Sequence, residues 1–311
     1  ASATAAPAPD PRTDTGSAHH DEQHHADAGG QSFPGADVKR IELEINRADV
    51  VFSPSPDGNV YVYSDSPDDF RVSLDKNGRL TVESRDKNTL VLFGAAGEKP
   101  VLTVTLPAEL GCALDAEVSM GSIQLENLSL GQVELDTDMG DVYVYGLACL
   151  SAELGSDCGS VQANSVTSSG GLSADADMGD VSVENCRAAG ELDADSSCGK
   201  VFVSACSAAD AEISAELGDV TVWELDCQRS IGIDCDCGAM EFKGLRARSI
   251  ELENDMGSIE GRLPGSITDY SIESGVDMGS NSLPKSFSSG GSIRLKAYAD
   301  CGSIDIVFED D

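Results

Sequence analysis

Positive charge, aromatic residues and histidine are all scarce in this sequence. Its 20 Lys and Arg stand against 55 Asp and Glu, so the formal net charge is -35 at pH 7, which excludes a nucleic-acid binder held by phosphate contacts. All four histidines lie within the first 25 residues. From Phe33 to Asp311 no imidazole is available for a Ser-His-Asp triad, a Cys-His pair or a His-ligated metal. Most familiar hydrolase mechanisms are therefore excluded.

Long apolar runs are absent as well. No stretch of about 18 apolar residues occurs and the sequence does not begin with Met, so we expect neither a membrane span nor a signal peptide within it. Aromatic residues make up only 5% of the chain, whereas glycine numbers 32 and the apolar set reaches 40%. A core is then expected to come from repetitive burial of small side chains.

The composition divides the chain into three parts. Residues 1–32 contain Ala, Pro, Gly, Asp and His without apolar periodicity and are predicted to be a flexible linker. The histidine pairs His19-His20 and His24-His25 in this linker could hold a transition metal weakly. Residues 33–110 show short alternating segments bounded by turn residues and are predicted to be β-strands with hairpins, continuous with the third part. That third part, residues 111–311, contains a repeat.

The repeat is marked by a glycine that recurs every 19 to 23 residues. The marker glycines are Gly121, Gly140, Gly159, Gly179, Gly199, Gly218, Gly238, Gly257, Gly279 and Gly302. Each is expected to occupy a turn that needs positive φ or a close backbone approach, and the acid two residues earlier is expected to cap that turn.

Apolar residues recur at fixed offsets from the marker glycine. Positions seven, five and one before it, such as Val133, Leu135 and Met139, and positions two, four and seven after it are predicted to face inward. One unit of this size cannot bury its apolar edge alone, whereas stacked units form a continuous core. The sequence therefore predicts an all-β, single-stranded, β-helix-like β-solenoid of about ten coils of 19–23 residues, with an N-terminal β-hairpin region. Its closing strand, residues 303–308, is expected at the end of the rod.

Most of the ten cysteines fall on predicted core positions. Cys158, Cys198, Cys237 and Cys301 share the offset of Met139, and Cys186 and Cys206 fall where other coils carry Leu or Val. We therefore interpret them as small core hydrophobes. Cys186 and Cys206 occupy equivalent places in adjacent coils, which would permit one disulfide in an oxidising compartment. The cluster Cys227, Cys235 and Cys237 lacks the paired spacing of a zinc site.

Acidic residues beside the glycines would align in rows when the coils stack. These rows make calcium a candidate ligand, because like charges repel and carboxylate oxygens suit this ion. The nonapeptide pattern of calcium-loaded β-rolls is missing, so Asx-turn capping on a solvated acidic face is the alternative. The candidate calcium residues are Asp138, Asp141, Asp157, Asp177 and Asp180.

Four aromatic residues are predicted on the outward face of the second strand of the coils: Tyr143, Tyr145, Phe202 and Trp223, the sole tryptophan. Aromatic side chains on a rigid face could stack on sugar rings or anchor a protein partner. Scattered surface aromatics are also ordinary, so the position alone does not establish a site.

The sequence resembles the DUF4097 family of bacterial β-strand-repeat proteins, whose members are often labelled as candidate adhesins. The resemblance lies in the runs 38–43 and 48–50, the segments 78–82 and 103–107, and Gly-Asp-Val or Gly-Ser-Ile repeats such as 139–142. It extends from about Phe33 to the C-terminus. The family implies a solenoid in the bacterial cell envelope, commonly beyond a membrane anchor or signal sequence, and supplies no catalytic residues to carry over.

Three functions remain open at this point. We favour a non-enzymatic binding scaffold of the cell envelope, or a secreted one, that is adhesin-like or envelope-sensing. Its expected partner is a protein or glycan on the cell surface, and we expect neither nucleic-acid binding nor a required cofactor. We expect the rod to be a monomer that its charge keeps soluble. A calcium-responsive structural spacer or assembly protein is the first alternative. A polysaccharide-processing enzyme is the second, since β-helix enzymes can use Asp clusters, but it needs a cleft with basic groups beside acids.

Overall fold

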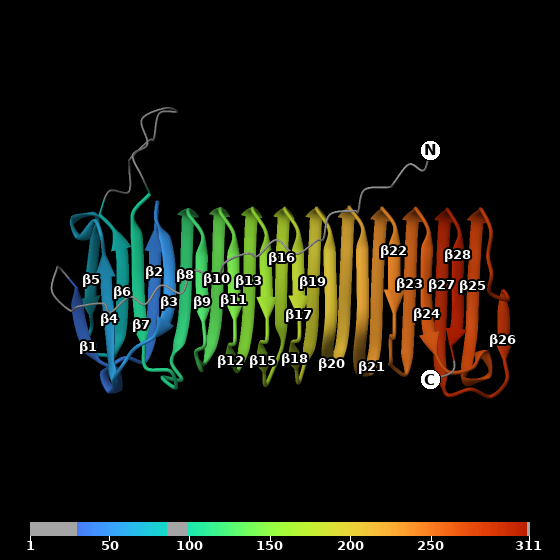
Figure 1. Cartoon of the computed structure of the whole chain (residues 1–311), viewed down its shortest axis with the longest axis horizontal. Helices are drawn as coiled ribbons and strands as arrows, with labels where there is room; N and C mark the ends of the chain where they lie inside the picture. The colour runs from blue at the N-terminus through green and yellow to red at the C-terminus, as the bar shows by residue number, and fades with distance from the viewer. Residues whose placement is uncertain (1–29, 86–98, 310–311) are drawn as a thin grey trace, which may run out of the picture.

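The computed structural model describes residues 30–85 and 99–309, which form a straight rod of stacked β-strand coils (Figure 1). The fold is an all-β solenoid of about 9 turns, which confirms the fold class expected from the glycine repeat. The other elements in the described ranges are the short 3-10 turns η1 (Gly35–Asp37), η2 (Pro67–Asp69) and η3 (Ile267–Asp269). The expected linker 1–32 lies outside the described residues except for its end, where Gln31 and Ser32 begin strand β1.

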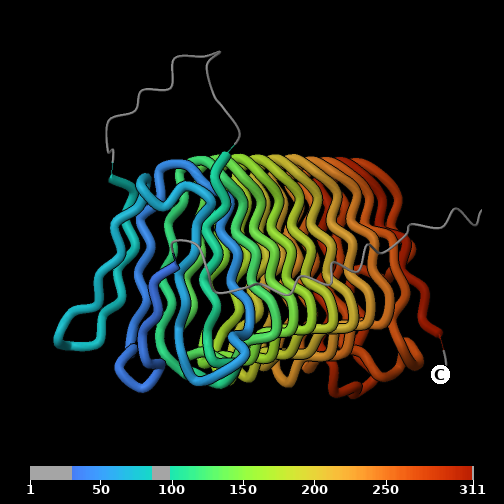
Figure 2. Tube along the Cα trace, turned by 60° about the vertical axis from the view of Figure 1, so that its left-hand side comes forward, coloured from blue at the N-terminus to red at the C-terminus, as the bar shows by residue number. Residues whose placement is uncertain are grey.

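Each coil contains a long strand, a glycine turn and a second strand, and coils in the middle of the rod add a third strand of two residues (Figure 2). We call the three resulting sides the long face, the second face and the narrow face. The long face contains, in stacking order, β5 (Phe70–Leu74), β6 (Arg79–Ser84), β2 (Arg40–Ile45), β8 (Ala113–Met120), β10 (Gln132–Met139), β13 (Ser151–Cys158), β16 (Leu172–Met178), β19 (Glu191–Cys198), the C-terminal parts of β20 (Val201–Leu217) and β21 (Val220–Cys237), β23 (Ser249–Met256), β27 (Ile293–Cys301), β25 (Tyr270–Met278) and β26 (Ser286–Ser288).

The second and narrow faces follow the same stacking direction. The second face contains β1 (Gln31–Pro34), β4 (Asn59–Ser64), β7 (Val101–Leu106), β3 (Asp49–Pro54), β9 (Ile123–Glu126), β11 (Val142–Tyr145), β14 (Val161–Asn164), β17 (Val181–Glu184), the N-terminal parts of β20 and β21, β22 (Met240–Lys243), β24 (Ile259–Pro264) and β28 (Ile304–Glu309). The narrow face contains β12 (Ala148–Cys149), β15 (Thr167–Ser168), β18 (Arg187–Ala188) and the middle of β20 and β21.

The coils do not stack in chain order at either end. Strands β2 and β3 lie between the coil β6–β7, which comes after them in the chain, and the coil β8–β9. At the other end β27 lies between β23 and β25. The closing strand β28 pairs with β24 and is the last strand of the second face, as expected from the sequence, whereas on the long face β25 and β26 extend the rod beyond its coil. Antiparallel strands β4, β5 and β26 flank the terminal coils, which protects the exposed strand edges from pairing with other chains.

The marker glycines form a line along the rod axis, and close backbone contact requires them. A Cβ added to any of them would lie between 1.5 and 2.0 Å from a carbonyl oxygen of the neighbouring coil, that of Ala48 for Gly121 and that of another marker glycine for the rest. The amide of Gly140 donates to the carbonyl of Cys158 in the next coil at 3.1 Å. Steric exclusion of a side chain is therefore what selects glycine.

Burial follows the predicted alternation except at the last two residues before the glycine. Val133 and Leu135 are buried, as are the residues two, four and seven positions after each marker glycine from Gly121 to Gly238. The position one before it faces outward, so the prediction for Met139 was wrong: its side chain is 52% exposed. Because the strand bends into the glycine turn, the residues one and two before the marker both face solvent. The prediction that Cys158, Cys198, Cys237 and Cys301 lie in the core was therefore also wrong.

The buried position is instead the one three residues before the glycine, and it is often polar. Thr137 Oγ1 donates to the carbonyl of Gly121 at 2.9 Å, and Ser196 Oγ donates to the carbonyl of Gly179 at the same distance. Asn254 Nδ2 donates to the carbonyl of Gly238 at 3.0 Å. These side chains give the carbonyls of the glycine line hydrogen-bond partners inside the rod, where an unpaired polar group is costly.

A second repeated turn comes after the second strand, and its backbone is left-handed. Gly146 and Gly244 occupy it with φ of 66° and 73°. Non-glycine residues occupy the same turn in other coils: Asn127, Ser165, Asn185, Ala205 and Glu224 have φ between 53° and 58°. Each of these five adopts a backbone conformation that costs about 1 kcal/mol or more for a residue with a Cβ.

Replacing Gly140 by Ala tests the glycine line. The added Cβ would lie 2.0 Å from the carbonyl oxygen of Gly121, which is backbone and cannot rotate away. We expect the free energy of unfolding to fall by about 3 kcal/mol or more, measured by urea denaturation followed by circular dichroism. Gly232→Ala is the matched control, because its Cβ would first meet Glu212 Oε1 at 3.5 Å. Equal losses in the two variants would contradict the steric explanation.

Candidate binding surfaces

The four aromatic residues lie on the second face in two separate pairs. Tyr143 and Tyr145 project from β11 with 37% and 53% of their surface exposed, and the hydroxyl of Tyr143 donates to Asp141 Oδ2 at 2.9 Å. Phe202 of β20 and Trp223 of β21 contact each other edge to face, with ring centroids 5.3 Å apart. The register places three strand spacings, about 14 Å, between Tyr143 and Phe202. The structure thus brings two of the four aromatics together.

The Phe202–Trp223 pair adjoins an open hollow of about 620 Å³. Lys243 is the register partner of Trp223 on the next strand, and Arg262 is the partner of Lys243 on the strand after that. Glu241 and Glu260 line the same hollow. An aromatic face, two cations and carboxylates therefore converge within a few strand spacings, and Arg262 also forms an ion pair with Glu309.

Sequence reasoning found Trp223 but missed its cationic neighbours. Trp223, Lys243 and Arg262 each stand five residues after a marker glycine, namely Gly218, Gly238 and Gly257. In-register stacking places residues at the same distance from their marker glycines side by side. The glycine repeat would therefore have been enough to predict that these three residues are neighbours.

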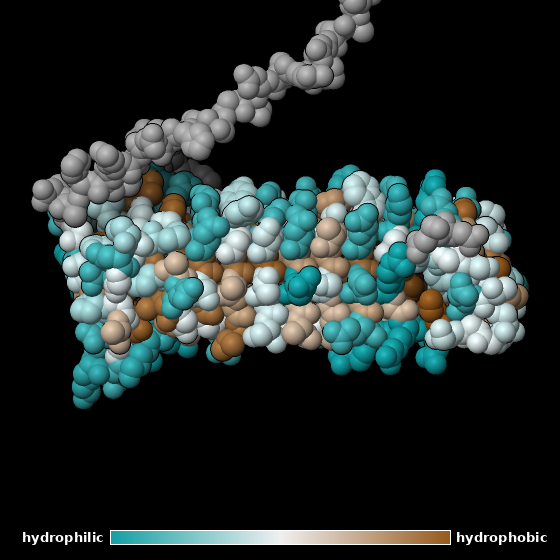
Figure 3. Space-filling view, turned by 60° about the horizontal axis from the view of Figure 1, so that its bottom comes forward, coloured by the Kyte–Doolittle hydropathy of each residue, from teal (hydrophilic) through white to brown (hydrophobic). Residues whose placement is uncertain are grey.

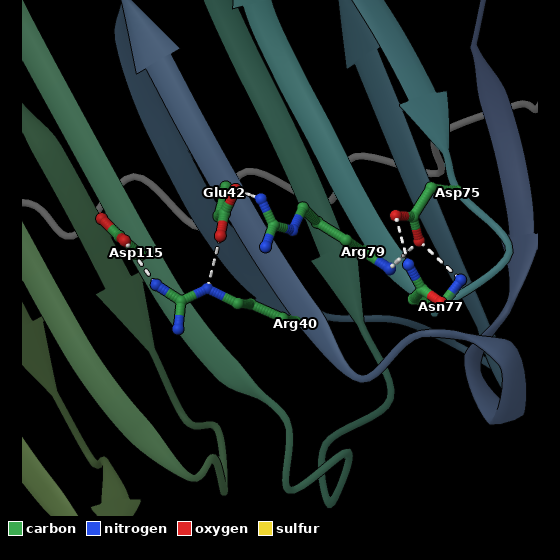
Figure 4. A network of polar contacts seen from close by, with 6 residues as sticks. All are labelled: Arg40, Glu42, Asp75, Asn77, Arg79 and Asp115. Atoms are coloured by element: carbon green, nitrogen blue, oxygen red, sulfur yellow. Dashed lines mark hydrogen bonds and ion pairs between the residues drawn. The ribbon is translucent and has the colours of Figure 1, made fainter.

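Acidic side chains dominate the outward positions of the long face. Cations pair with them at both ends of the rows: Arg40 donates to Glu42 at 2.5 Å and to Asp115 at 2.8 Å, as Figure 4 shows, and Lys296 pairs with Glu251 at 2.7 Å. Arg229 also pairs with Asp210 in the middle of the rod. Between these ends the two acidic rows are, in stacking order, Glu134, Glu153, Asp193 and Glu212, and beside them Glu117, Asp136, Asp175, Asp195, Asp234 and Glu253.

Burial and like charge raise the pKa of carboxyls in these rows. Partial burial, followed by repulsion from Asp175 and other acids, raises the pKa of Asp193 to about 6. Burial is also the main cause of the raised pKa of Asp175, whereas repulsion from Asp115 is the main cause of the raised pKa of Glu134. The long face therefore stores electrostatic repulsion at neutral pH, which protons or bound cations would relieve.

The candidate calcium residues fall into two groups with different surroundings. Asp141 Oδ1 accepts the amide of Ser160 at 2.8 Å, and Asp180 Oδ1 accepts that of Lys200 at 2.8 Å. The acid one residue after the glycine thus caps the next coil, whereas the repeat pattern predicted capping by the acid two residues before it. Asp138, Asp157 and Asp177 are exposed. Within residues 30–85 and 99–309, no three His, Cys, Asp or Glu side chains gather closely enough to hold a metal ion.

The cysteines are all free thiols. Cys186 and Cys206 are buried, as predicted, and the amide of Cys186 donates to Cys206 Sγ at 3.4 Å. The interaction with Cys206, together with burial, raises the pKa of Cys186. Cys227 and Cys235 are buried as well, which leaves Cys237 the accessible member of that predicted cluster.

The narrow face is lined by small side chains. Figure 3 views the rod from this side and shows pale and brown residues running along it between rows of hydrophilic side chains. A shallow hollow of about 720 Å³ follows the short strands, with Ala148, Cys149, Ser168 and Ala188 in its lining. Because these side chains are short, the face is flat and offers few directed polar groups.

The fold and its repeated glycine-marked coils define a β-solenoid with regular outward rows. The family described as Toastrack DUF4097 matches residues 38–185 and 121–230, and the chain belongs to this family.

The solved structures to which this chain is similar have low sequence identity to it. A "putative lipid binding protein" from Parabacteroides distasonis is 14% identical with a TM-score of 0.48, and a "putative adhesin" from the same species is 13% identical with a TM-score of 0.47. A "putative adhesin" from Bacteroides fragilis is 16% identical with a TM-score of 0.43. Each similarity covers 89% of this chain and 96% of the other. No curated protein matches the sequence, and the described residues contain no helix with the length and hydropathy of a membrane span.

Asp193→Asn tests the cost of a carboxylate that is both partly buried and surrounded by other acids on the long face. A carboxyl whose pKa is raised in the folded state binds its proton more tightly there than in the unfolded chain. The folded state is therefore favoured at low pH, and stability is lost as pH rises from about 4 to about 6. Removing the charge should raise the free energy of unfolding at pH 7 by about 1 kcal/mol, less than the full shift implies because water reaches the side chain. The gain should vanish near pH 4. The exposed Asp68→Asn is the control for removing one charge, and an identical pH profile in both variants would refute the assignment.

Proposed function

We propose that this protein is a non-enzymatic, adhesin-like binding scaffold of the bacterial cell surface or envelope, and that the hollow beside Trp223 contacts a glycan or protein partner. The proposal rests on one observation above all: the exposed Trp223, held against Phe202, lies beside Lys243 and Arg262 on a rod of strongly negative net charge.

The chemistry of the hollow suits an acidic or polyhydroxylated ligand. The Trp223 ring is 42% exposed and offers an apolar face for a sugar ring, while its edge-to-face contact with Phe202 limits its motion. Lys243 and Arg262 supply hydrogen-bond donors for carboxylate, sulfate or hydroxyl groups, and Glu241 and Glu260 supply acceptors. Because all of these residues stand on paired strands, the backbone of the site is fixed before a ligand arrives, which reduces the entropy lost on binding.

A non-enzymatic role fits the distribution of reactive groups. The sequence has no histidine after residue 25, and the marker turns use their acids as backbone caps. A regular rod also presents its outward side chains in parallel rows, an arrangement suited to extended contact with a partner.

We expect Trp223→Ala to abolish or strongly weaken binding to the glycans that the unmodified protein binds on a glycan array. Loss of the ring removes a contact of about 1–3 kcal/mol, so affinity should fall about tenfold or more. Tyr145→Ala is the matched control, because that ring is comparably exposed but lies in the other aromatic pair. If binding survives Trp223→Ala and fails in Tyr145→Ala, the glycan site lies at the pair of tyrosines instead. Measured depolymerisation of a bound glycan would favour a polysaccharide-processing enzyme.

A calcium-responsive structural role is the second candidate, and the acidic rows of the long face favour it. Repulsion is the main cause of the raised pKa of Glu134 and adds to the effect of burial at Asp193 and Asp175, and a divalent cation would relieve it. The rows of Asp138, Asp157 and Asp177 add exposed carboxylates next to the glycine turns.

Thermal unfolding in the presence of calcium tests this second role. A specific site should stabilise the rod by about 2.7 kcal/mol at a calcium concentration one hundred times Kd, with a corresponding rise in Tm. Magnesium at the same ionic strength is the control for general screening, and the variant D138N/D157N/D177N distinguishes the turn row from the long face. Equal effects of both cations would exclude a calcium-specific site.

A further inference from the structure

The residues that precede the marker glycines form an exposed row of sulfur side chains along one edge of the rod. Parallel pairing in register puts consecutive members side by side. In stacking order the row is Met120, Met139, Cys158, Met178, Cys198, Leu217, Cys237, Met256, Cys301 and Met278. Leu217 divides it into two tracts of consecutive sulfur residues.

This row concentrates the exposed sulfur of the protein. Five of the six methionines belong to it, and Met240, the sixth, is buried in the core. Met139, Met178, Met256 and Met278 are between 52% and 65% exposed. Cys158 and Cys198 are exposed, and Cys237 and Cys301 are partly exposed. The core therefore does not account for the choice of these residues, because their side chains do not lie in it.

No two cysteines of the row are neighbours. Cys158 lies between two methionines, and the exchange of coil order at the C-terminal end puts Cys301 between Met256 and Met278. Chain order would have put the two methionines together. The closest cysteines of the row are two strand spacings apart, about 9.6 Å between Cα atoms, which is beyond the reach of a disulfide. The thiols of the row within one chain are thus kept from forming disulfides with one another.

The spacing of the row suits a metal ion held between two sulfur atoms. Neighbouring strands are about 4.8 Å apart, and two metal–sulfur bonds of about 2.3 Å placed end to end span about 4.6 Å. A thiolate and a thioether on adjacent strands can therefore bracket one ion with little movement of the backbone. Thiolate and thioether ligands disfavour hard cations, and a site with two sulfur ligands suits copper(I) better than zinc, which takes four ligands.

An acidic row runs beside the sulfur row and supplies an electrostatic attraction for cations. The residue immediately before the sulfur position is Asp or Glu in every coil of the repeat except those of Ser119 and Ser197. Asp157 and Asp177 of this row are exposed and flank the first tract. Such a row raises the local concentration of positive ions at the edge of the rod.

We propose that this edge binds copper(I), with adjacent Cys and Met side chains of each tract as paired ligands. Each cysteine would bind as a thiolate and release its proton to solvent when the ion enters. The ions remain in the +1 state, so no oxidant or reductant takes part. This inference is independent of the glycan or protein site on the second face.

Anaerobic titration of the fully reduced chain with copper(I), against a competing chromophoric chelator, tests the proposal. All proteins carry His19, His20, His24 and His25 replaced by Ala, so that imidazole ligands do not contribute. We expect at least one ion per tract, and X-ray absorption should show sulfur ligands alone. Zinc(II) under the same conditions should bind far more weakly.

Substitutions in the first tract should weaken its binding without unfolding the rod. Cys158→Ser combined with Met178→Leu keeps the size of both exposed side chains and removes both sulfur atoms. Loss of a residue that only hydrogen-bonds to a metal ligand costs about 10–100-fold in metal affinity. Loss of two ligands themselves should therefore cost roughly 100-fold or more. Circular dichroism and Tm of the variant confirm that the fold is kept.

Leu217→Met provides a gain-of-function test, because it joins the two tracts into one uninterrupted row. It should increase the number of copper(I) ions bound. Leu150→Met is the matched control, since Leu150 is 60% exposed but lies off the row. The proposal is overturned if the reduced chain binds no copper(I), if C158S/M178L binds as well as the parent, or if oxygen or nitrogen ligands dominate the spectrum.

Discussion

The close approach of one glycine backbone to the next is the constraint on which the rest of this structure depends. Each coil turns so tightly at its marker glycine that a Cβ there would overlap the carbonyl oxygen of the neighbouring coil. The glycine amides and carbonyls are in turn hydrogen-bonded along the axis, to the next coil and to buried Thr, Ser or Asn side chains. This contact sets the register, and the register places every other offset in a straight row.

Rows are the functional unit of such a rod. The properties of a side chain depend on its neighbours on the adjacent strands. Trp223 contacts the ring of Phe202 and stands next to Lys243, and repulsion from Asp175 contributes to the raised pKa of Asp193. The same regularity that gives a continuous core of small side chains also multiplies like charge on the long face. A fold of this kind therefore has electrostatic repulsion as a consequence of repetition, and Arg40 and Lys296 reduce it at the ends of the acidic rows.

Much of the fold could be read from the chain because stacking repeats the same offsets in each coil. The alternation at Val133 and Leu135, the buried positions after the marker glycines from Gly121 to Gly238 and the burial of Cys186 and Cys206 could all be predicted from period-two alternation counted from a fixed glycine. The same reasoning failed at Met139 and its equivalents, because alternation assumes a straight strand and the chain bends there. The candidate site was predicted less completely: Trp223 was named, whereas Lys243 and Arg262 were overlooked although they share its offset.

The sequence by itself determined the repeat, the glycine line, the aliphatic core and the acidic character of the rod, because these depend on offsets within one coil. Only the tertiary structure decided which coils are neighbours at the two ends, which way the residues before each glycine face, and which aromatics meet. These features depend on contacts between coils that are far apart in the chain and on a local bend in the backbone. Residue spacing does not encode either one directly.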